Sequence, residues 1–135
     1  MFEIKKVAVL GAGNGGFMSA ADMSAHLGYE VAIFDAIPGK LEGVKKTGTI
    51  EVMDIDSKPT GVVGKIALAS DDIGEVIKGA QVILNPVPYL ATETYAKLAA
   101  PYLEDGQMVI SLGKGGASLT WAKILKEAGV NKNVY

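Results

Sequence analysis

The stretch VAVLGAGNGG, residues 7–16, places four apolar residues directly before a run with glycine at four of six positions. Glycine loses more backbone entropy on folding than any other residue, so such a cluster is expected only where the backbone needs a positive φ or where another group approaches closely. The apolar residues before it are typical of a strand that is buried on both faces. The sequence therefore predicts a buried strand that ends in a tight, glycine-rich turn.

A helix and a second strand follow this turn. Residues 14–27 place apolar and small side chains at helical spacing, and Gly28 suits the C′ position just after a helix. Residues 30–35, EVAIFD, form the predicted second strand, and residues 39–46 form a short polar helix. Together with a first strand at residues 4–10, these segments make one βαβ unit.

The pattern changes between residues 47 and 70, where short alternating runs are broken by glycine and proline. We expect two or three short strands here, as a small hairpin inserted before a third sheet strand at residues 65–69. Ser70 is the predicted N-cap of the next helix, with Asp71 and Asp72 in its first turn. The elements expected after it are a helix to about Lys78, a strand at 81–84, a helix at 91–103, a strand at 108–112, a helix at 118–128 and the first residues of another strand at 133–135.

Strands that alternate with helices indicate an α/β fold with a parallel sheet covered on both faces. Because crossovers between parallel strands are right-handed, the natural arrangement is a doubly wound parallel sheet, the Rossmann fold, with the small hairpin inserted after the second βα unit. No linker or low-complexity segment interrupts the pattern. We therefore expect residues 1–135 to form a single dinucleotide-binding domain.

Composition excludes several classes of function. A formal net charge of −2 gives no electrostatic reason to expect nucleic acid or an anionic membrane as a partner. The sequence has no cysteine and one histidine, which excludes disulfides and a structural zinc site, so we predict no metal. The N-terminal apolar run is too short for a signal peptide, and no segment is long enough to span a bilayer. We expect a cytoplasmic protein.

The glycine turn has the spacing of a dinucleotide-binding fingerprint. In that motif the first glycine makes the tight turn, the second lets the backbone approach a pyrophosphate, and the third allows the helix to pack closely on the strand. Gly11, Gly13 and Gly16 occupy these positions, directly after the first strand and at the start of the first helix. Asn14 and Gly15 lie in the same turn and complete the predicted pyrophosphate-binding segment.

Asp35 supplies the second half of the fingerprint at the end of the second strand. An acidic residue about 20 positions after the third glycine accepts hydrogen bonds from the adenosine ribose. Its charge would repel the 2′-phosphate of NADP, and the nearest following cation is Lys40. The predicted cofactor is therefore NAD, with NADP less favoured.

Other candidate residues have plainer explanations. The SLGKGG segment is not a P-loop, because Gly115 stands where Ser or Thr should hold a magnesium ion. His26 lies at the far end of the first helix from the glycine turn, where it suits a capping or surface role. Tyr89 and Lys114 follow strands that should end near the cofactor, and each is also compatible with an ordinary loop.

Three longer segments resemble the N-terminal domain of the octopine/nopaline (opine) dehydrogenase family. They are residues 7–35, which contain the glycine turn, residues 87–112 and the GKGGASL segment at 113–119. The more specific part of the resemblance is the pair Val87 and Pro88, followed by the helix at 95–103 that leads into DGQ. The resemblance adds Val87 and Pro88 to the predicted cofactor-binding residues.

The resemblance implies an oxidoreductase that uses NAD(P)H to condense an amino acid reductively with a 2-keto acid. It also implies that the catalytic residues lie in a second, helical domain beyond residue 135, so none is predicted in this chain. The amino acid and keto acid would then be its small-molecule partners, and a homo-oligomer is compatible with the sequence. Two alternatives stay open: a domain of a related ketopantoate or glycerol-3-phosphate reductase, and a stand-alone NAD-sensing module without catalysis.

Overall fold

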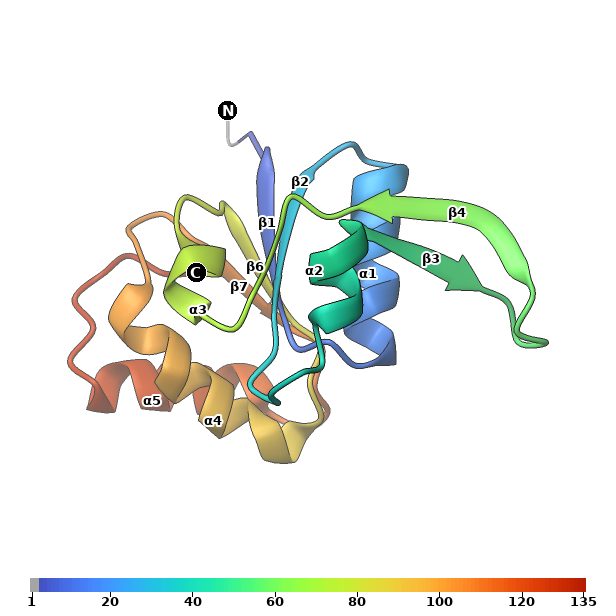
Figure 1. Ribbon diagram of the computed structural model, residues 1–135. Helices are drawn as coiled ribbons and strands as arrows, with labels where there is room; N and C mark the ends of the chain where they lie inside the picture. The colour runs from blue at the N-terminus through green and yellow to red at the C-terminus, as the bar shows by residue number, and fades with distance from the viewer. Residues whose placement is uncertain (1–2) are drawn as a thin grey trace.

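The computed structural model, which describes residues 3–135, contains a five-stranded parallel sheet with helices on both faces (Figure 1). Its strands are β1 (Lys6–Leu10), β2 (Glu30–Phe34), β5 (Leu68–Ser70), β6 (Val82–Asn85) and β7 (Met108–Ser111), in the spatial order β5-β2-β1-β6-β7. The helices are α1 (Asn14–Ala25), α2 (Glu42–Thr47), α3 (Ile73–Ile77), α4 (Tyr89–Ala99), the 3₁₀ helix η1 (Ala100–Tyr102) and α5 (Ala117–Glu127). The predicted doubly wound α/β fold is confirmed.

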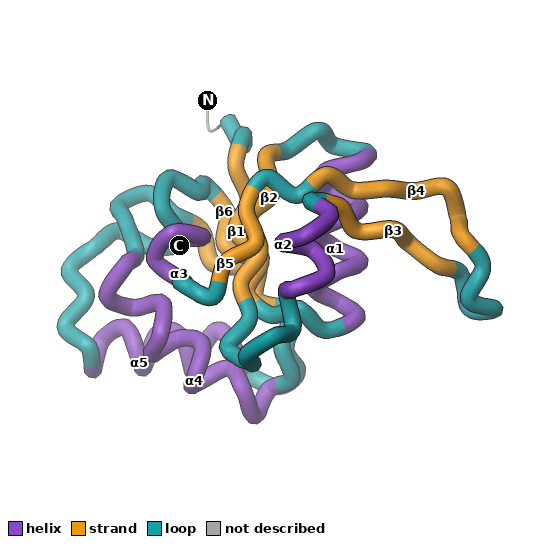
Figure 2. Tube along the Cα trace, in the orientation of Figure 1, coloured by secondary structure: helices purple, strands orange, loops and turns teal. Residues whose placement is uncertain are grey.

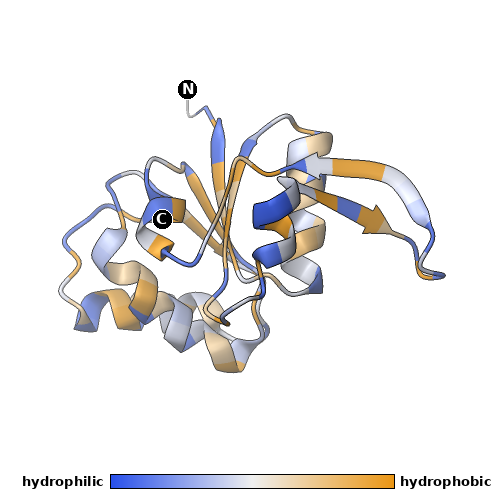
Figure 3. Cartoon of the chain, viewed as in Figure 1, coloured by the Kyte–Doolittle hydropathy of each residue, from blue (hydrophilic) through white to orange (hydrophobic). Residues whose placement is uncertain are grey.

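The central strands are buried on both faces, which explains their nearly continuous apolar sequences (Figure 3). Successive side chains of β1 enter different cores: Val7 and Val9 pack with α1 and α2, and Ala8 and Leu10 pack with α3, α4 and α5. Because both faces of the strand need apolar residues, the run VAVL shows no alternation with polar residues.

The strand order places a reversal beside β1. The chain runs from β1 outward through β2 to the edge strand β5, then returns to pair β6 on the other side of β1. Ligands of such sheets bind outside the carboxyl ends of the strands at this switch point. The glycine turn after β1 therefore lies at the expected place for a ligand.

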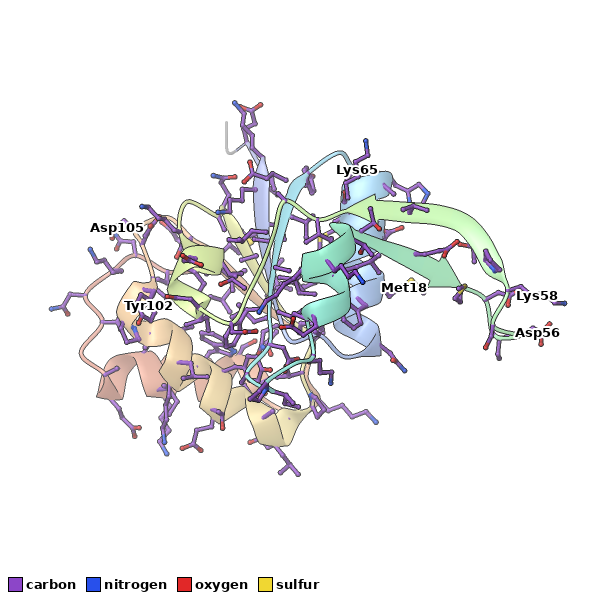
Figure 4. The ribbon with its side chains drawn as sticks, in the orientation of Figure 1. Met18, Asp56, Lys58, Lys65, Tyr102 and Asp105 are labelled. Atoms are coloured by element: carbon purple, nitrogen blue, oxygen red, sulfur yellow. The ribbon has the colours of Figure 1, made fainter. Side chains whose placement is uncertain are left out.

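The predicted hairpin is present between β2 and β5. Its strands, β3 (Thr49–Met53) and β4 (Pro59–Lys65), are antiparallel and form a separate two-stranded sheet that projects from the body (Figure 2). Asp56 and Lys58 lie at its far tip (Figure 4). At its base, Gly64 packs directly on the backbone of Ala21 in α1, leaving no room for a side chain. The hairpin thus covers a second face of α1, beside the face that packs on the main sheet.

The N-cap predicted for α3 was wrong. Ser70 is the last residue of β5, and the N-cap is Asp72, two residues later, directly before the first helical residue Ile73. The carboxylate of Asp72 accepts hydrogen bonds from the N–H groups of Gly74 and Glu75, at 2.8 and 3.3 Å. The Ser70 hydroxyl instead accepts from the Asp72 N–H and donates to Glu75. Both residue types are good caps, and the extension of β5 to residue 70 decides between them.

The other elements lie where the sequence predicts them, with shifted ends. The third sheet strand is Leu68–Ser70 rather than 65–69, because Lys65 ends β4, and the helix predicted at 39–46 begins only at Glu42. The helix predicted at 91–103 begins at Tyr89 and tightens into η1 at Ala100. Helix α1 ends at Ala25 with His26 as its C-cap, so the C′ position is Leu27, and the left-handed Gly28 (φ 68°), predicted at C′, lies one position further on.

Residues 133–135 do not form a strand of their own but hydrogen-bond like one. Tyr135 donates its N–H to the Gln107 carbonyl at 3.0 Å and accepts from the Val109 N–H at 2.7 Å. In a parallel pair of strands, a residue on one strand bonds to the two residues on either side of the residue opposite it, here Gln107 and Val109 on either side of Met108. Tyr135 thus pairs with the outer edge of β7, as the predicted sixth strand would.

We predict that Gly64→Ala lowers the free energy of unfolding by about 1–3 kcal/mol, because the added methyl overpacks the contact between β4 and the α1 backbone. Urea unfolding followed by circular dichroism measures the change. Gly43→Ala in α2 is the matched control: a Cβ there meets no other atom within 4 Å, so a neutral or slightly stabilising effect is expected. A Gly64 variant as stable as the unmodified chain would contradict the contact.

Candidate functional site: the glycine turn

The turn between β1 and α1 uses two of its glycines for close packing. Gly11 has φ 116°, which side-chain-bearing residues rarely adopt, and its N–H donates to the Phe34 carbonyl at 2.7 Å. A Cβ on Gly16 would overlap the Gly11 carbonyl. The first and third glycines therefore let the start of α1 rest directly on the end of β1.

Gly13 has a different role. Its backbone is extended (φ −80°, ψ −176°), so a side chain would not be strained there, and a Cβ would meet no protein atom within 4 Å. Gly13 is also exposed and serves as the N-cap of α1 without a side-chain hydrogen bond. The second glycine is thus not required by packing inside this chain. It leaves open space directly in front of a helix N-terminus.

The N-terminus of α1 is suited to an anion. The Phe17 N–H donates to the Gly13 carbonyl at 2.9 Å, so the N–H groups of Asn14, Gly15 and Gly16 precede the first full helical turn and have no acceptor within the helix. No acidic residue lies in the first turn to compete for them. Free N–H groups and the positive end of the helix dipole together favour a negatively charged group such as a phosphate.

Asp35 connects the glycine turn to the end of β2. Its carboxylate accepts hydrogen bonds from the Ala12 N–H at 2.6 Å and from the Ile37 N–H at 2.8 Å. The side chain is 4% exposed, which is unusual for an acidic residue and requires such partners. Each carboxylate oxygen retains capacity for another hydrogen bond, so Asp35 can hold the turn and still accept from a ligand.

Tyr95 and Val87 form the floor under this part of the site. Tyr95 packs its ring edge-on against Phe34, with the centroids 5.8 Å apart, and its hydroxyl accepts a long hydrogen bond from the Ala36 N–H at 3.4 Å. Burial raises the pKa of Tyr95, the Ala36 N–H lowers it, and the charge of Asp35 raises it again, with a net increase. The hydroxyl therefore stays protonated. Val87 is buried beneath Gly11, where a Cβ would collide with the valine side chain.

The remaining predicted residues fall into two groups. Pro88 is exposed at the N-cap of α4, and Tyr89 and Lys114 are exposed at the same carboxyl edge of the sheet. His26 is the C-cap of α1 and its ring bonds Asp22 at 2.8 Å, which agrees with the predicted capping or surface role. The fold thus gathers the glycine turn, Asp35, Val87 and Pro88 at one edge and leaves His26 at the other.

Sequence reasoning missed three side chains that support this edge: Tyr95, Asn85 and Trp121. Asn85 is fully buried at the end of β6 and bonds both Leu10 and Trp121. The sequence carried one usable signal for it, since an amide at the end of the apolar run VILN needs a buried partner. Tyr95 and Trp121 lie on helices and carried no comparable signal, because an aromatic residue on a helix is most often simple core.

Comparison with known proteins decides the family. A family model described as the N-terminus of NAD-dependent glycerol-3-phosphate dehydrogenase matches residues 6–132. The chain belongs to this family. Its description makes the chain an NAD-dependent domain, in agreement with the predicted cofactor. None of the helices in residues 3–135 has the length and apolar character needed to cross a membrane.

Individual relatives include both dehydrogenase types considered from the sequence. An opine dehydrogenase of Arthrobacter sp. (strain 1C) is 36% identical over 96% of this chain and 35% of its own length. A glycerol-3-phosphate dehydrogenase [NAD(P)+] of Lactobacillus delbrueckii subsp. bulgaricus is 30% identical over 82% of this chain and 31% of its own. A solved structure of octopine dehydrogenase with NADH and L-arginine is 28% identical with a TM-score of 0.75, covering 90% of this chain and 32% of that one.

These relatives confirm the resemblance to the N-terminal domain of opine dehydrogenases. The chain spans about a third of the length of the relatives that it matches.

We predict that Asp35→Ala lowers the free energy of unfolding by about 1.5–3 kcal/mol, because the Ala12 N–H loses a charged acceptor in a buried position. Urea unfolding followed by the fluorescence of Trp121, the one tryptophan in the sequence, measures the loss. Asp56→Ala at the exposed hairpin tip is the control and should stay within about 0.5 kcal/mol. Equal stability of the Asp35 variant and the unmodified chain would show that the carboxylate does not hold the turn.

Proposed function

We propose that residues 1–135 bind NAD(H) at the glycine turn and form the nucleotide-binding domain of an opine dehydrogenase-like oxidoreductase. The observation that carries the proposal is the open space at Gly13 in front of the unpaired N–H groups of α1. Gly11 and Gly16 are explained by packing within the chain, whereas Gly13 is not. A group from outside the chain that needs backbone contact explains it.

Each proposed binding residue has a distinct role. The N–H groups of Asn14, Gly15 and Gly16 would donate to the pyrophosphate, and Gly13 would admit it. Asp35 would accept hydrogen bonds from the adenosine ribose while it holds Ala12. Val87 and Pro88 would border the site from the β6 side. When bound, the reduced nicotinamide supplies the hydride, and this chain's residues bind and orient the cofactor.

The surroundings of Asp35 favour NAD over NADP. A 2′-phosphate beside the carboxylate would meet a like charge in a buried setting. The sequence contains lysines but no arginine, the residue that recognises phosphate with a bidentate fork. Lys45, on the adjacent helix α2, is already engaged by Asp71 and Glu42. Lys40 is exposed in the loop after β2 and is the nearest cation in sequence without an ion pair among the described residues.

For the whole enzyme we propose reductive condensation of an amino acid with a 2-keto acid, with the hydride delivered to the imine carbon. Support comes from the opine and octopine dehydrogenases among the relatives and from the octopine dehydrogenase structure with NADH and L-arginine. The catalytic groups would lie in a second domain, since the relatives are about three times as long as this chain. A cytoplasmic location stays part of this proposal.

Glycerol-3-phosphate dehydrogenation is the second candidate, and the family description and several relatives favour it. Both candidates use the nucleotide-binding domain in the same way. Substrate assays of the complete enzyme distinguish them: NADH oxidation that requires an amino acid together with a keto acid supports the first, and oxidation with dihydroxyacetone phosphate alone supports the second.

We predict that the chain binds NADH more tightly than NADPH, and that Asp35→Ala narrows the ratio of the two affinities. The variant should lose roughly tenfold or more in NADH affinity, because charge-assisted hydrogen bonds to the ribose disappear. Calorimetric titration with both cofactors measures it. Because both cofactors are titrated into the same variant, a general weakening of the turn lowers both affinities and leaves their ratio unchanged. Equal affinities of the unmodified chain for NADH and NADPH would remove Asp35 from the site.

Gly13→Val is the sharpest control for the position of the ligand. The extended backbone at residue 13 accepts a side chain, and a Cβ there meets no protein atom within 4 Å, so the variant should fold. Its free energy of unfolding should fall by no more than about 1 kcal/mol, because valine is a poorer N-cap than glycine. NADH binding should nevertheless be lost, because the side chain fills the space in front of α1. Gly43→Ala should bind NADH normally. A folded Gly13 variant with normal NADH affinity would show that the ligand does not lie on this turn.

We also predict that the 135 residues alone bind NADH without oxidising it, even when an amino acid and pyruvate are present. A positioned proton donor and acceptor typically contribute about 10²- to 10⁴-fold to such reactions. Of the described residues, Asp35 is bonded to the backbone and His26 lies at the far end of α1, so neither is placed to serve as that acid or base. Absorbance at the reduced nicotinamide band follows the reaction. Turnover by a preparation of verified intact mass would contradict the proposed division of roles.

A further inference from the structure

Asn85 is a fully buried amide that joins three elements of the fold. Its Nδ2 donates to the Leu10 carbonyl at the end of β1, and its Oδ1 accepts from the Trp121 indole N–H of α5, both at 3.2 Å. Leu10 and Trp121 are themselves buried, at 0% and 3% exposed. A buried amide is costly unless it is hydrogen-bonded, and an apolar residue would fill the same place without that requirement. The two hydrogen bonds therefore indicate that Asn85 does more than fill space in the core.

The bond to Leu10 falls on the peptide unit that leads into the glycine turn. The carbonyl of this unit accepts from Asn85, and its N–H, that of Gly11, donates to the Phe34 carbonyl at 2.7 Å. Because a peptide unit is planar, holding it at both polar ends fixes its orientation. The residue that follows β6 is Pro86, which has no N–H, so the side chain of Asn85 supplies a donor to Leu10 where the backbone stops supplying one.

The bond to Trp121 extends this support to α5. Helix α5 follows the glycine-rich loop at residues 112–116, which leaves β7 at the same carboxyl edge as the glycine turn. The indole N–H fixes which way the Asn85 amide faces, since the amide oxygen must point to Trp121 and the amide nitrogen to Leu10. Packing of α5 therefore determines how firmly the peptide before Gly11 is held.

We propose that Asn85 is a positioning residue for cofactor binding, which it supports by holding the Leu10–Gly11 peptide on the side opposite β2, while Trp121 of α5 holds the Asn85 amide. The inference rests on the proposed binding of NAD(H) at the glycine turn. It assigns Asn85 no contact with the cofactor. Its effect passes through the orientation of the turn, whose N–H groups must point at the pyrophosphate.

A pair of matched variants separates positioning from plain stability. Asn85→Leu removes both hydrogen bonds with little change in volume. Gln107→Met removes another buried amide, whose Nε2 donates to the carbonyls of Ile77 and Ala80 next to the opposite edge of the sheet. Both variants should unfold at a lower urea concentration than the unmodified chain. NADH affinity should fall about tenfold in the Asn85 variant only, as measured by calorimetry below the unfolding transition.

Two further variants keep the test decisive. Trp121→Phe retains an aromatic ring but removes the indole donor, and it should weaken NADH binding about threefold even if Asn85→Leu does not fold. The double variant Asn85→Leu/Trp121→Phe replaces both partners of the Asn85–Trp121 hydrogen bond by apolar groups. Its free energy of unfolding should therefore fall by less than the sum of the two single losses, while its NADH affinity stays low.

Normal NADH affinity of a folded Asn85→Leu variant, or of Trp121→Phe where the former does not fold, would overturn the role of Asn85. So would an equal loss of affinity in Gln107→Met. These outcomes leave the proposed function intact, because they presuppose that the unmodified chain binds NADH. Failure of the unmodified chain to bind NADH counts against the proposed function itself.

Discussion

The direct contact between Gly16 and the Gly11 carbonyl determines where α1 lies on the sheet. A side chain at Gly16 would push the helix away from β1, and with it the base of the hairpin that packs on α1 at Gly64, whereas a side chain at Gly11 would collide with Val87. The same contact brings the first N–H groups of α1 to the carboxyl end of β1. A packing constraint between two glycines thus creates the electrostatic property of the site, because the helix dipole is useful only where its N-terminus is placed.

Most of the fold could be predicted because the physical signals were local. The apolar run before the glycines, the helical spacing after them and the repeated alternation of strands and helices are sufficient for a doubly wound sheet. Element ends were less predictable, since they depend on pairing between distant segments. Ser70 and Asp72 are both good caps in isolation, and only the pairing of Phe34 with Ser70 in the parallel ladder places Ser70 in a strand.

The candidate site shows the same difference between local signals and contacts of distant segments. Gly11, Gly13, Gly16 and Asp35 follow a fixed spacing along the chain, so the sequence alone was enough to select them. The hydrogen bond that Asp35 accepts from the Ala12 N–H depends on how β1 and β2 lie side by side and could not be inferred from spacing. Asn85 and Trp121 are 36 residues apart, and their contact exists only after β6 and α5 have packed.

The central place of β1 has a consequence for how the domain can be divided. Its two neighbours come from different halves of the chain: Val7 lies opposite Val31 on one side and opposite Val82 on the other. Neither half can satisfy both edges of β1, so a fragment that stops after β5 would expose a long apolar edge open to pairing with other chains. Folding should therefore be cooperative across the whole sheet, and a nascent chain that has produced only the first half would depend on protection against aggregation until β6 emerges.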